Sequence, residues 1–400
     1  MSEYRELLKS PGVGRILTAQ LAARLPAGML SLTLLIHIEV LHGSYGAAGL
    51  VLAAMSIGQG IAGPLTTRWM GRWHMRPVLA LTTLVCVGAI TVLALVDLSI
   101  WAAMVVGFVG GLALPPVSAA VRTIYPKIVP AQQLTPLFSL DAAAQELIWV
   151  MGPVLAIFVA TQISPVIALL IAAGLMLLGG IWFIVSPELG RIRIPRPRGS
   201  IGGVLKNPVV LIATIAGFLL VANCAALEAA VVSIYGDSGA ESGIIIAVWS
   251  LGSLVGGLLL GRMALTGWSL AQRFFIILVG CALAMVWLDF WWLSASLFLS
   301  GLGLAPAMAA MSAQVSSSVR FSETAESFGW VNTGQLIGAA LGSAVAGFLI
   351  DGIGSIGGFF AAVGLILIAL VLAVSTVRWL PDLRGRDVGP APDTQPIAML

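Results

Sequence analysis

The chain has 400 residues, of which 59% are hydrophobic and only 9% are charged, with a formal net charge of +3. A soluble domain carries about 25% charged residues, and a water-soluble fold of this length could not bury so much apolar surface. The composition therefore excludes a soluble protein and predicts an integral membrane protein. We attribute the small positive charge to loops on one side of the bilayer and not to nucleic-acid binding.

Apolar segments long enough to cross a bilayer recur along the whole chain. A transmembrane helix needs about 20 apolar residues, and we apply this length as the criterion. The expected spans are residues 16–40, 46–67, 77–97, 99–121, 137–162 and 165–186, followed by 208–235, 242–261, 272–290, 292–316, 327–350 and 355–378. The sequence therefore predicts an all-α membrane protein with twelve transmembrane helices.

The segment between the sixth and seventh spans, "PELGRIRIPRPRGSIGGVLKN", is basic and rich in Pro and Gly. It predicts a cytoplasmic linker, 187–207, between an N-terminal six-helix bundle, 1–186, and a C-terminal six-helix bundle, 208–380. Polar and Pro-rich composition predicts that residues 381–400 form a disordered cytoplasmic tail.

The basic residues predict the orientation of the chain. With these spans, all but one of the 20 Lys and Arg residues fall on one side, while acids such as Glu39, Asp97 and Asp351 fall on the other. Positive residues mark the cytoplasmic side. We therefore expect a multi-pass protein of the plasma membrane with both termini in the cytoplasm. The one basic residue left over is Arg24, which lies inside the first span.

The two halves of the chain resemble each other in register. Gly63 and Arg68 at the end of the second span recur as Gly257 and Arg262 at the end of the eighth. The segment "GLALPP" (111–116) recurs as "GLGLAP" (301–306). In the fifth and eleventh spans the recurring pairs are Gln145 with Gln335 and Gly152 with Gly342. Such matches predict two bundles related by a parallel pseudo-twofold repeat, which is the build of one large transporter class.

The loop after the second span, "GPLTTRWMGRW" (63–73), carries the first of two motifs. Together with the layout of the spans, it resembles the major facilitator superfamily, whose pattern here is Gly-x-Leu-x-Asp-Arg-x-Gly-Arg. Thr67 stands where the family has aspartate, and the second glycine comes one residue late. The resemblance implies that this loop latches the two halves through charge pairs; the other interpretation is a short turn with interfacial tryptophans. The residues concerned are Gly63, Leu65, Arg68, Gly71 and Arg72, with Arg262 as the copy of Arg68.

The second motif is "ELIWVMGPVLA" (146–156) in the fifth span. Gly152 and Pro153 resemble the Gly-Pro element of the drug exporters in the same superfamily, although the glycine pair that often follows is absent. The resemblance implies export. The other interpretation is a helix kink at Pro153, whose freed carbonyl group is satisfied by neighbouring helices.

Ionisable side chains inside a membrane are costly and usually face a cavity or a partner. Away from the span ends they are Arg24, Asp141, Glu146 and Glu228. A helix rises about 1.5 Å per residue, so Arg24 and Glu146 lie roughly 12 and 13 Å from the cytoplasmic end. The family resemblance implies that the first and fifth helices pack side by side, so these two residues are expected to pair. Asp141 lies closer to that end, where water can reach it.

Two interpretations of the Arg24–Glu146 pair stay open. Burial raises the pKa of a carboxyl group and a nearby arginine lowers it, so Glu146 can exchange a proton as a cavity opens; alternatively the pair is a fixed ion pair. Glu228, past the midpoint of the seventh span, is expected to be a protonatable cavity group. Five amide side chains are candidates either for substrate binding or for helix packing: Gln59, Gln145, Asn223, Asn332 and Gln335.

Signatures of an enzyme, a metal site or a nucleotide-binding loop are missing from the sequence, so no cofactor is expected. The favoured function is a secondary transporter that works by alternating access and exports a small organic molecule, such as a drug-like compound or a sugar, coupled to protons. The alternatives are a proton-coupled nutrient importer and, less favoured, a membrane sensor that does not transport. The expected partners are the substrate, protons and lipid, and the protein is expected to be a monomer.

We predict that a cysteine at Arg193 reacts with a membrane-impermeant reagent only from the cytoplasm. A cysteine at Ser238 is expected to react only from outside, because the two positions lie on opposite sides of the predicted spans. Labelling of intact cells and of inside-out vesicles measures this. The reverse pattern would overturn the predicted orientation together with the span count.

Overall fold

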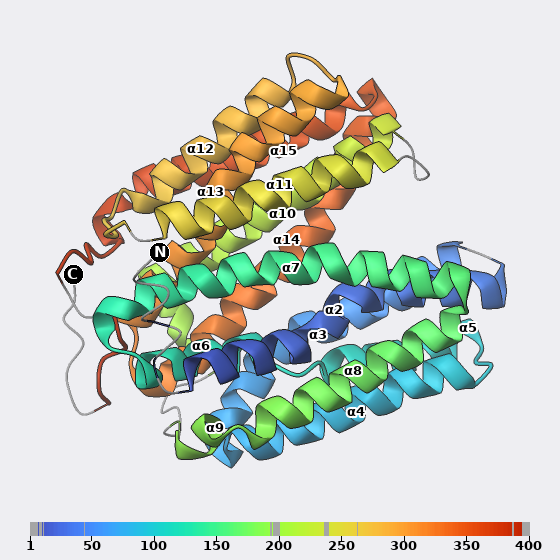
Figure 1. The fold of residues 1–400 in the computed structure, drawn as a ribbon, viewed down its shortest axis with the longest axis horizontal. Helices are drawn as coiled ribbons and strands as arrows, with labels where there is room; N and C mark the ends of the chain where they lie inside the picture. Colours follow the sequence, from blue (N-terminus) through green and yellow to red (C-terminus); the bar gives the residue numbers. More distant parts are fainter. Residues whose placement is uncertain are drawn as a thin grey trace. The chain divides into compact units, whose positions relative to one another are not determined.

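The computed structural model describes residues 7, 10, 12–43, 45–192, 194, 201–235, 240–261, 263–385 and 388–393. These residues are predominantly helical, and the described part of the chain contains no β-strand (Figure 1). In the first half the helices are α2 (Val13–His42), α3 (Tyr45–Trp73), α4 (Met75–Leu95), α5 (Ile100–Leu112), α6 (Val117–Ile128), α7 (Ala131–Gln162), α8 (Pro165–Val185) and α9 (Pro187–Arg191). In the second half they are η1 (Gly203–Lys206), α10 (Pro208–Tyr235), α11 (Ala240–Leu260), α12 (Ser269–Ala284), α13 (Phe290–Ser318), α14 (Phe321–Ile353), α15 (Ile356–Ser375) and η2 (Val377–Trp379).

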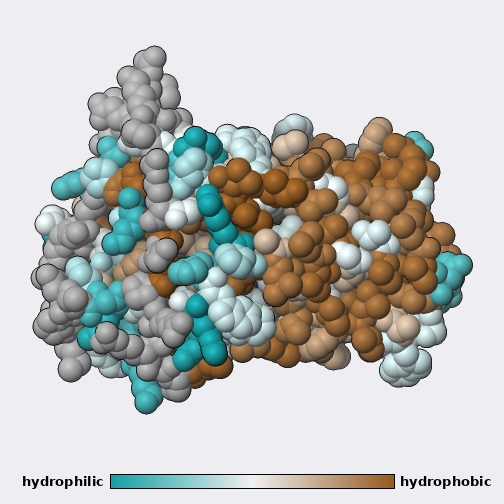
Figure 2. Space-filling view, turned by 90° about the horizontal axis from the view of Figure 1, so that it is seen from below, coloured by the Kyte–Doolittle hydropathy of each residue, from teal (hydrophilic) through white to brown (hydrophobic). Residues whose placement is uncertain are grey.

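Each predicted span corresponds to helical structure. Eleven helical segments of the described chain are long and apolar enough to cross a membrane, with Ile100–Ile128 counted as one segment. The predicted ninth span is the shorter apolar helix α12, which ends at Ala284 and not near residue 290. On the face drawn in Figure 2, hydrophobic residues form a broad area toward one end and hydrophilic residues gather toward the other. The prediction of an all-helical membrane fold is confirmed.

The fourth span differs from the prediction of one helix because it is broken into α5 and α6. The break covers Ala113–Pro116, where Pro115 and Pro116 follow each other. Proline donates no backbone hydrogen bond and pushes the residue before it out of the helical region. In the repeat copy the first proline is replaced by Ala305, and α13 continues through Pro306 as one helix. One proline is tolerated at this place and two are not.

The described residues form two compact units. Unit 1 comprises Met1–Val129, Leu147–Gly202 and Phe321–Gly329, and unit 2 comprises Pro130–Glu146, Gly203–Arg320 and Trp330–Leu400. Most of each unit comes from one half of the sequence. Helices α7 and α14 are the exceptions, because each begins in one unit and continues in the other.

Equivalent helix pairs in the two units pack through equivalent glycines. In unit 1, α3 crosses α5 so closely that a β-carbon on Gly58 would overlap the carbonyl oxygen of Phe108. In unit 2, α11 crosses α13 in the same way, with Gly252 against the carbonyl oxygen of Phe298. Small residues let membrane helices approach backbone to backbone. The internal repeat read from the sequence is therefore present in the packing.

The described part of the segment expected to be a disordered tail is packed against unit 2. Leu383 and Val388 are buried, and the backbone N–H of Leu383 donates to the carbonyl oxygen of Leu265 at 2.9 Å. These apolar side chains are separated by Pro, Gly and charged residues, so the composition of the segment predicted a disordered tail. Residues 386–387 and 394–400 lie outside the described residues.

We predict that Gly111→Ala destabilises the protein, whereas Gly88→Ala does not. A β-carbon on Gly111 would overlap the carbonyl oxygen of Met55 and lie 3.1 Å from the backbone nitrogen of Gln59, whereas one on Gly88 meets nothing within 4 Å. Overpacking of this kind costs about 1–3 kcal/mol. Thermal unfolding of the two variants in detergent measures the difference. Equal midpoints would show that the α3–α5 crossing is not tightly packed.

Candidate functional site

The first residues of α14, Phe321–Gly329, are held by unit 1, and we call them the α14 start. Glu326 is only 2% exposed. Its carboxylate accepts a hydrogen bond from Nη1 of Arg68 at 3.3 Å and another from the backbone N–H of Gly202 at 2.8 Å. A buried carboxylate needs a countercharge and hydrogen-bond donors. The end of α3 and the end of the linker supply both.

Two further cations of unit 1 lie over aromatic rings of the α14 start. The guanidinium of Arg122 lies 5.9 Å from the ring centre of Phe328, and the ammonium of Lys127 lies 4.4 Å from that of Phe321. Both cations belong to α6, so α6 and α3 both contact the α14 start. A cation over an aromatic ring contributes about 0.5–2 kcal/mol, depending on how far it is desolvated.

The backbones of α3 and the α14 start approach closely at Gly329. A β-carbon there would lie 2.6 Å from Oγ1 of Thr67 and 2.8 Å from the carbonyl oxygen of Gly63. Thr67 is 1% exposed, and its hydroxyl donates to the Gly63 carbonyl oxygen at 2.7 Å. Within the motif this is the position where the family has aspartate. Threonine satisfies its own hydroxyl here, so the crossing buries no second charge.

Unit 2 contains the repeat copy of this crossing. The register that matches Gly63 with Gly257 also matches Thr67 with Gly261. In unit 2 the hydroxyl comes from the partner helix: Oγ of Ser139, in α7, donates to the Gly257 carbonyl oxygen at 2.8 Å, and a β-carbon on Gly261 would overlap it. Each crossing thus has one hydroxyl side chain and one glycine. In unit 1 the hydroxyl is on α3 and the glycine on α14, whereas in unit 2 the hydroxyl is on α7 and the glycine follows α11. Arg262, the predicted copy of Arg68, lies outside the described residues.

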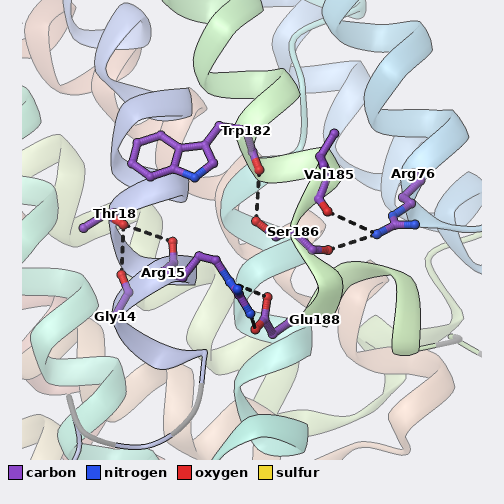
Figure 3. A network of polar contacts seen from close by, with 8 residues as sticks. All are labelled: Gly14, Arg15, Thr18, Arg76, Trp182, Val185, Ser186 and Glu188. Carbon is purple, nitrogen blue, oxygen red and sulfur yellow. Dashed lines mark hydrogen bonds and ion pairs between the residues drawn. The ribbon is translucent and has the colours of Figure 1, made fainter.

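The linker is anchored in unit 1 near both of its ends. Figure 3 shows the guanidinium of Arg15, in α2, against the carboxylate of Glu188, in α9. Nearby, Nη2 of Arg76 donates to the carbonyl oxygens of Val185 and Ser186 at 3.4 and 3.1 Å, so a cation sits at the C-terminal end of α8, where the helix dipole favours it. Gly202 holds the other end through Glu326.

The predicted intramembrane charges are divided between the units. Arg24 is 8% exposed, lies in unit 1 and donates from Nη1 to Oε1 of Gln20 at 2.7 Å. Asp141 lies in unit 2 and is fully buried. The expectation that water reaches it is wrong, because the start of α7 packs against α11. Glu228 is exposed on α10. The side chain of Glu146 lies outside the described part, so its pairing with Arg24 stays a prediction.

The five amide candidates have different surroundings. Asn223 is fully buried inside unit 2, where its Nδ2 donates to the carbonyl oxygen of Ala362 at 2.9 Å, a contact that favours the helix-packing alternative. Gln335 packs beside Gly217 of α10. The half-buried members of the set are Gln59, Gln145, Asn332 and Gln335.

The Gly-Pro motif lies at a helix crossing in unit 1. A β-carbon on Gly152 would lie 2.6 Å from the backbone of Gly28, so α7 and α2 meet there at backbone distance. This close approach explains the need for glycine without a kink, and α7 runs as one helix through the motif. The side chain of Pro153 is not among those described.

The sequence prediction missed Glu326, Gly202 and the aromatic partners of α6. Glu326 falls one position before the predicted span 327–350, where a hydropathy criterion ignores it. One signal was available: Glu326 is an acid on the side where nearly all the basic residues fall. Its pairing with Arg68, far away in the sequence, depends on the tertiary fold.

Two repeats of apolar helices, joined by an anchored linker, are the architecture of a membrane carrier. The sequence profile of the Major Facilitator Superfamily matches residues 16–288 and again residues 223–398. These overlapping matches cover most of the chain, and the chain belongs to the Major Facilitator Superfamily. Its members are transporters. A comparison with curated proteins gives no match.

Solved transporter structures share this fold. A bacterial homologue of the iron transporter ferroportin, in an outward-facing state, aligns with a TM-score of 0.73 and 14% identity over 92% of this chain and 98% of that chain. The human organic anion transporter MFSD10 (TETRAN) aligns with a TM-score of 0.69 and 18% identity over 91% of this chain and 100% of that chain. At these identities the likeness shows the fold alone.

We predict that Arg68→Ala and Glu326→Ala each lower the free energy of unfolding by about 2 kcal/mol, since each removes a charge-assisted hydrogen bond at a buried carboxylate. The double variant should cost less than the sum, because one interaction is lost only once. Denaturant titration of the detergent-solubilised protein measures the cycle. The exposed pair Arg384–Asp382 is the control, and Arg384→Ala should cost less than about 1 kcal/mol. Additive effects at Arg68 and Glu326 would show that the pair contributes nothing.

Proposed function

We propose that this protein is a secondary active transporter that exports a small organic molecule by alternating access, coupled to protons. Membership of the Major Facilitator Superfamily supports the transporter class. The observation that carries the mechanism is the grip of Arg68, Arg122 and Lys127 on the α14 start, because α14 continues from there into unit 2. Because α14 belongs to both units, its contacts with one unit must break when the units move apart.

In this proposal the α14 start is a latch. Its described contacts include the Arg68–Glu326 ion pair, the Gly202 hydrogen bond, two cation–π contacts and one close glycine crossing. The polar contacts contribute only about 0.5–3 kcal/mol each, so they can break one by one during a transport cycle. In the sequence, Arg68 and its copy Arg262 directly follow the second and eighth predicted spans. We expect both to affect turnover more than folding. A permanent contact between transporter halves would instead bury a large apolar surface.

The proton-carrying group we favour is Glu228. It lies well inside the predicted seventh span, away from its ends, and is exposed on α10. The buried Arg24 is the second functional charge: it pairs with Glu146 or holds an anionic part of the substrate. Ionisable residues at such depth mark proton or substrate pathways.

Export from the cytoplasm across the plasma membrane is the direction we propose, with both termini in the cytoplasm. The basic loops support this orientation. Support for export comes from the resemblance of Gly152 and Pro153 to the exporter motif. Proton-coupled uptake of a nutrient is the alternative within transport, and it uses the same architecture in reverse.

The test is reconstitution of the purified protein in proteoliposomes with an imposed pH gradient. The panel should contain drug-like cations, sugars, organic anions and iron. The last two are included because one structural neighbour is an organic anion transporter and another is a homologue of an iron transporter. The expected result is that the pH gradient drives accumulation of one compound, which moves in the direction opposite to the protons. If no compound moves in either direction while the protein is folded, the transport proposal fails.

We predict that Glu228→Gln reduces gradient-driven transport to the rate seen without a pH gradient, because glutamine keeps the shape of the side chain but cannot bind a proton. The same substitution at Glu241, an exposed acid of α11, is the matched control and should leave the rate unchanged. Wild-type coupling in Glu228→Gln would exclude this residue as the proton site.

A further inference from the structure

The segment after α15 packs against unit 2 and reaches the residues that follow α13. We call residues 380–393 the C-terminal strap, of which 386–387 lie outside the described residues. Leu380, Leu383 and Val388 are each buried to at least 93%. A chain of this composition that buries three apolar side chains is docked, because exposed tails leave such side chains in water.

The strap is also hydrogen-bonded to the junction between α13 and α14, residues 318–320. The backbone N–H of Ala391 donates to the carbonyl oxygen of Val319 at 3.0 Å, and Ala391 forms a parallel β-bridge with Arg320. The preceding carbonyl group, that of Ser318, accepts from Nδ2 of Asn207 at 2.6 Å. The last carbonyl groups of a helix lack partners within it, and here the strap and the end of the linker supply them.

The junction is also the place where the chain leaves unit 2. Arg320 is the last residue of its stretch of unit 2, and Phe321 is the first residue of the α14 start in unit 1. Val319 is 1% exposed, so water does not readily replace the Ala391 donor. Residues 318–320 are therefore the last part of unit 2 before the chain continues into the α14 start.

We propose that the C-terminal strap is a conformational device that holds this junction in the geometry in which the α14 start meets Arg68, Arg122 and Lys127. A segment that is already ordered loses less conformational entropy when it binds. The strap therefore strengthens the latch through residues 318–320, and release of the strap opens the latch. This inference rests on the proposed role of the α14 start as a latch.

The experiment follows Thr67, which is 1% exposed and lies against Gly329 while the latch is closed. Thr67→Cys is introduced together with Cys224→Ala, and the detergent-solubilised protein is labelled with a water-soluble maleimide. Cys86 and Cys281, which are fully buried in the two units, stay in place as internal reporters of unfolding. Peptide mass spectrometry resolves the three sites, and no substrate is needed.

Ala391→Pro removes the N–H that bonds Val319, and Ala391→Ser is the matched control that keeps it. A chain ending after Gly385 keeps Leu380 and Leu383 but removes the part of the strap that bonds Val319, without adding a proline. In both released forms we expect labelling at position 67 to rise about tenfold, the change expected when one more residue must be ordered for the latch to close. Cys86 and Cys281 should stay unlabelled.

Equal labelling in Ala391→Pro and Ala391→Ser would overturn the proposal. Faster labelling of all three cysteines would also overturn it, because the strap would then only stabilise the fold. Transport failure and strap failure are distinguishable, since the labelling rate is measured without substrate. Loss of transport in the wild-type protein would leave the labelling result intact.

Discussion

Close backbone contact between helices is the constraint on which the rest of this structure depends. Lipid removes the hydrophobic drive for helices to associate, so packing must come from contact at short range. Glycines at the crossings provide it, as Gly58 does against Phe108 and Gly152 does against Gly28. The α14 start has the same kind of close contact at Gly329, and its ion pair and cation–π contacts lie on the same helix segment. The charged contacts determine which segments pair, and the glycines determine how closely the two helix backbones approach.

The fold could be predicted from the sequence because its determinants are local. Apolar length located the helices, and the residues that recur in register between the halves indicated the two repeats. The break at Pro115 was missed because a hydropathy window counts side chains and ignores missing backbone donors. The docked strap was missed for a related reason: Leu383 and Val388 stand alone among polar residues, and their burial depends on a surface built by distant loops.

The site was less predictable than the fold. Arg68 was found because a motif and a repeat copy mark it, but its partner Glu326 carries no motif. Asn223 illustrates the opposite case, in which a polar residue suggested a substrate contact and the structure gives it a backbone partner, Ala362, inside unit 2. Sequence identifies which side chains are costly in a membrane. Helix packing decides which of these side chains meet, and the identity of a single residue says little about that packing.

The exchange of hydroxyl and glycine between the two crossings has an evolutionary consequence. Two copies of the first half would bring Thr67 against Ser139, two side chains where there is room for one. Two copies of the second half would bring Gly261 against Gly329 and leave a gap. The repeats have therefore become complementary, and neither can assemble a working pair with a duplicate of itself. The fold therefore depends on two unlike halves, and a side chain added at either glycine alone would collide with the hydroxyl residue of the opposite helix.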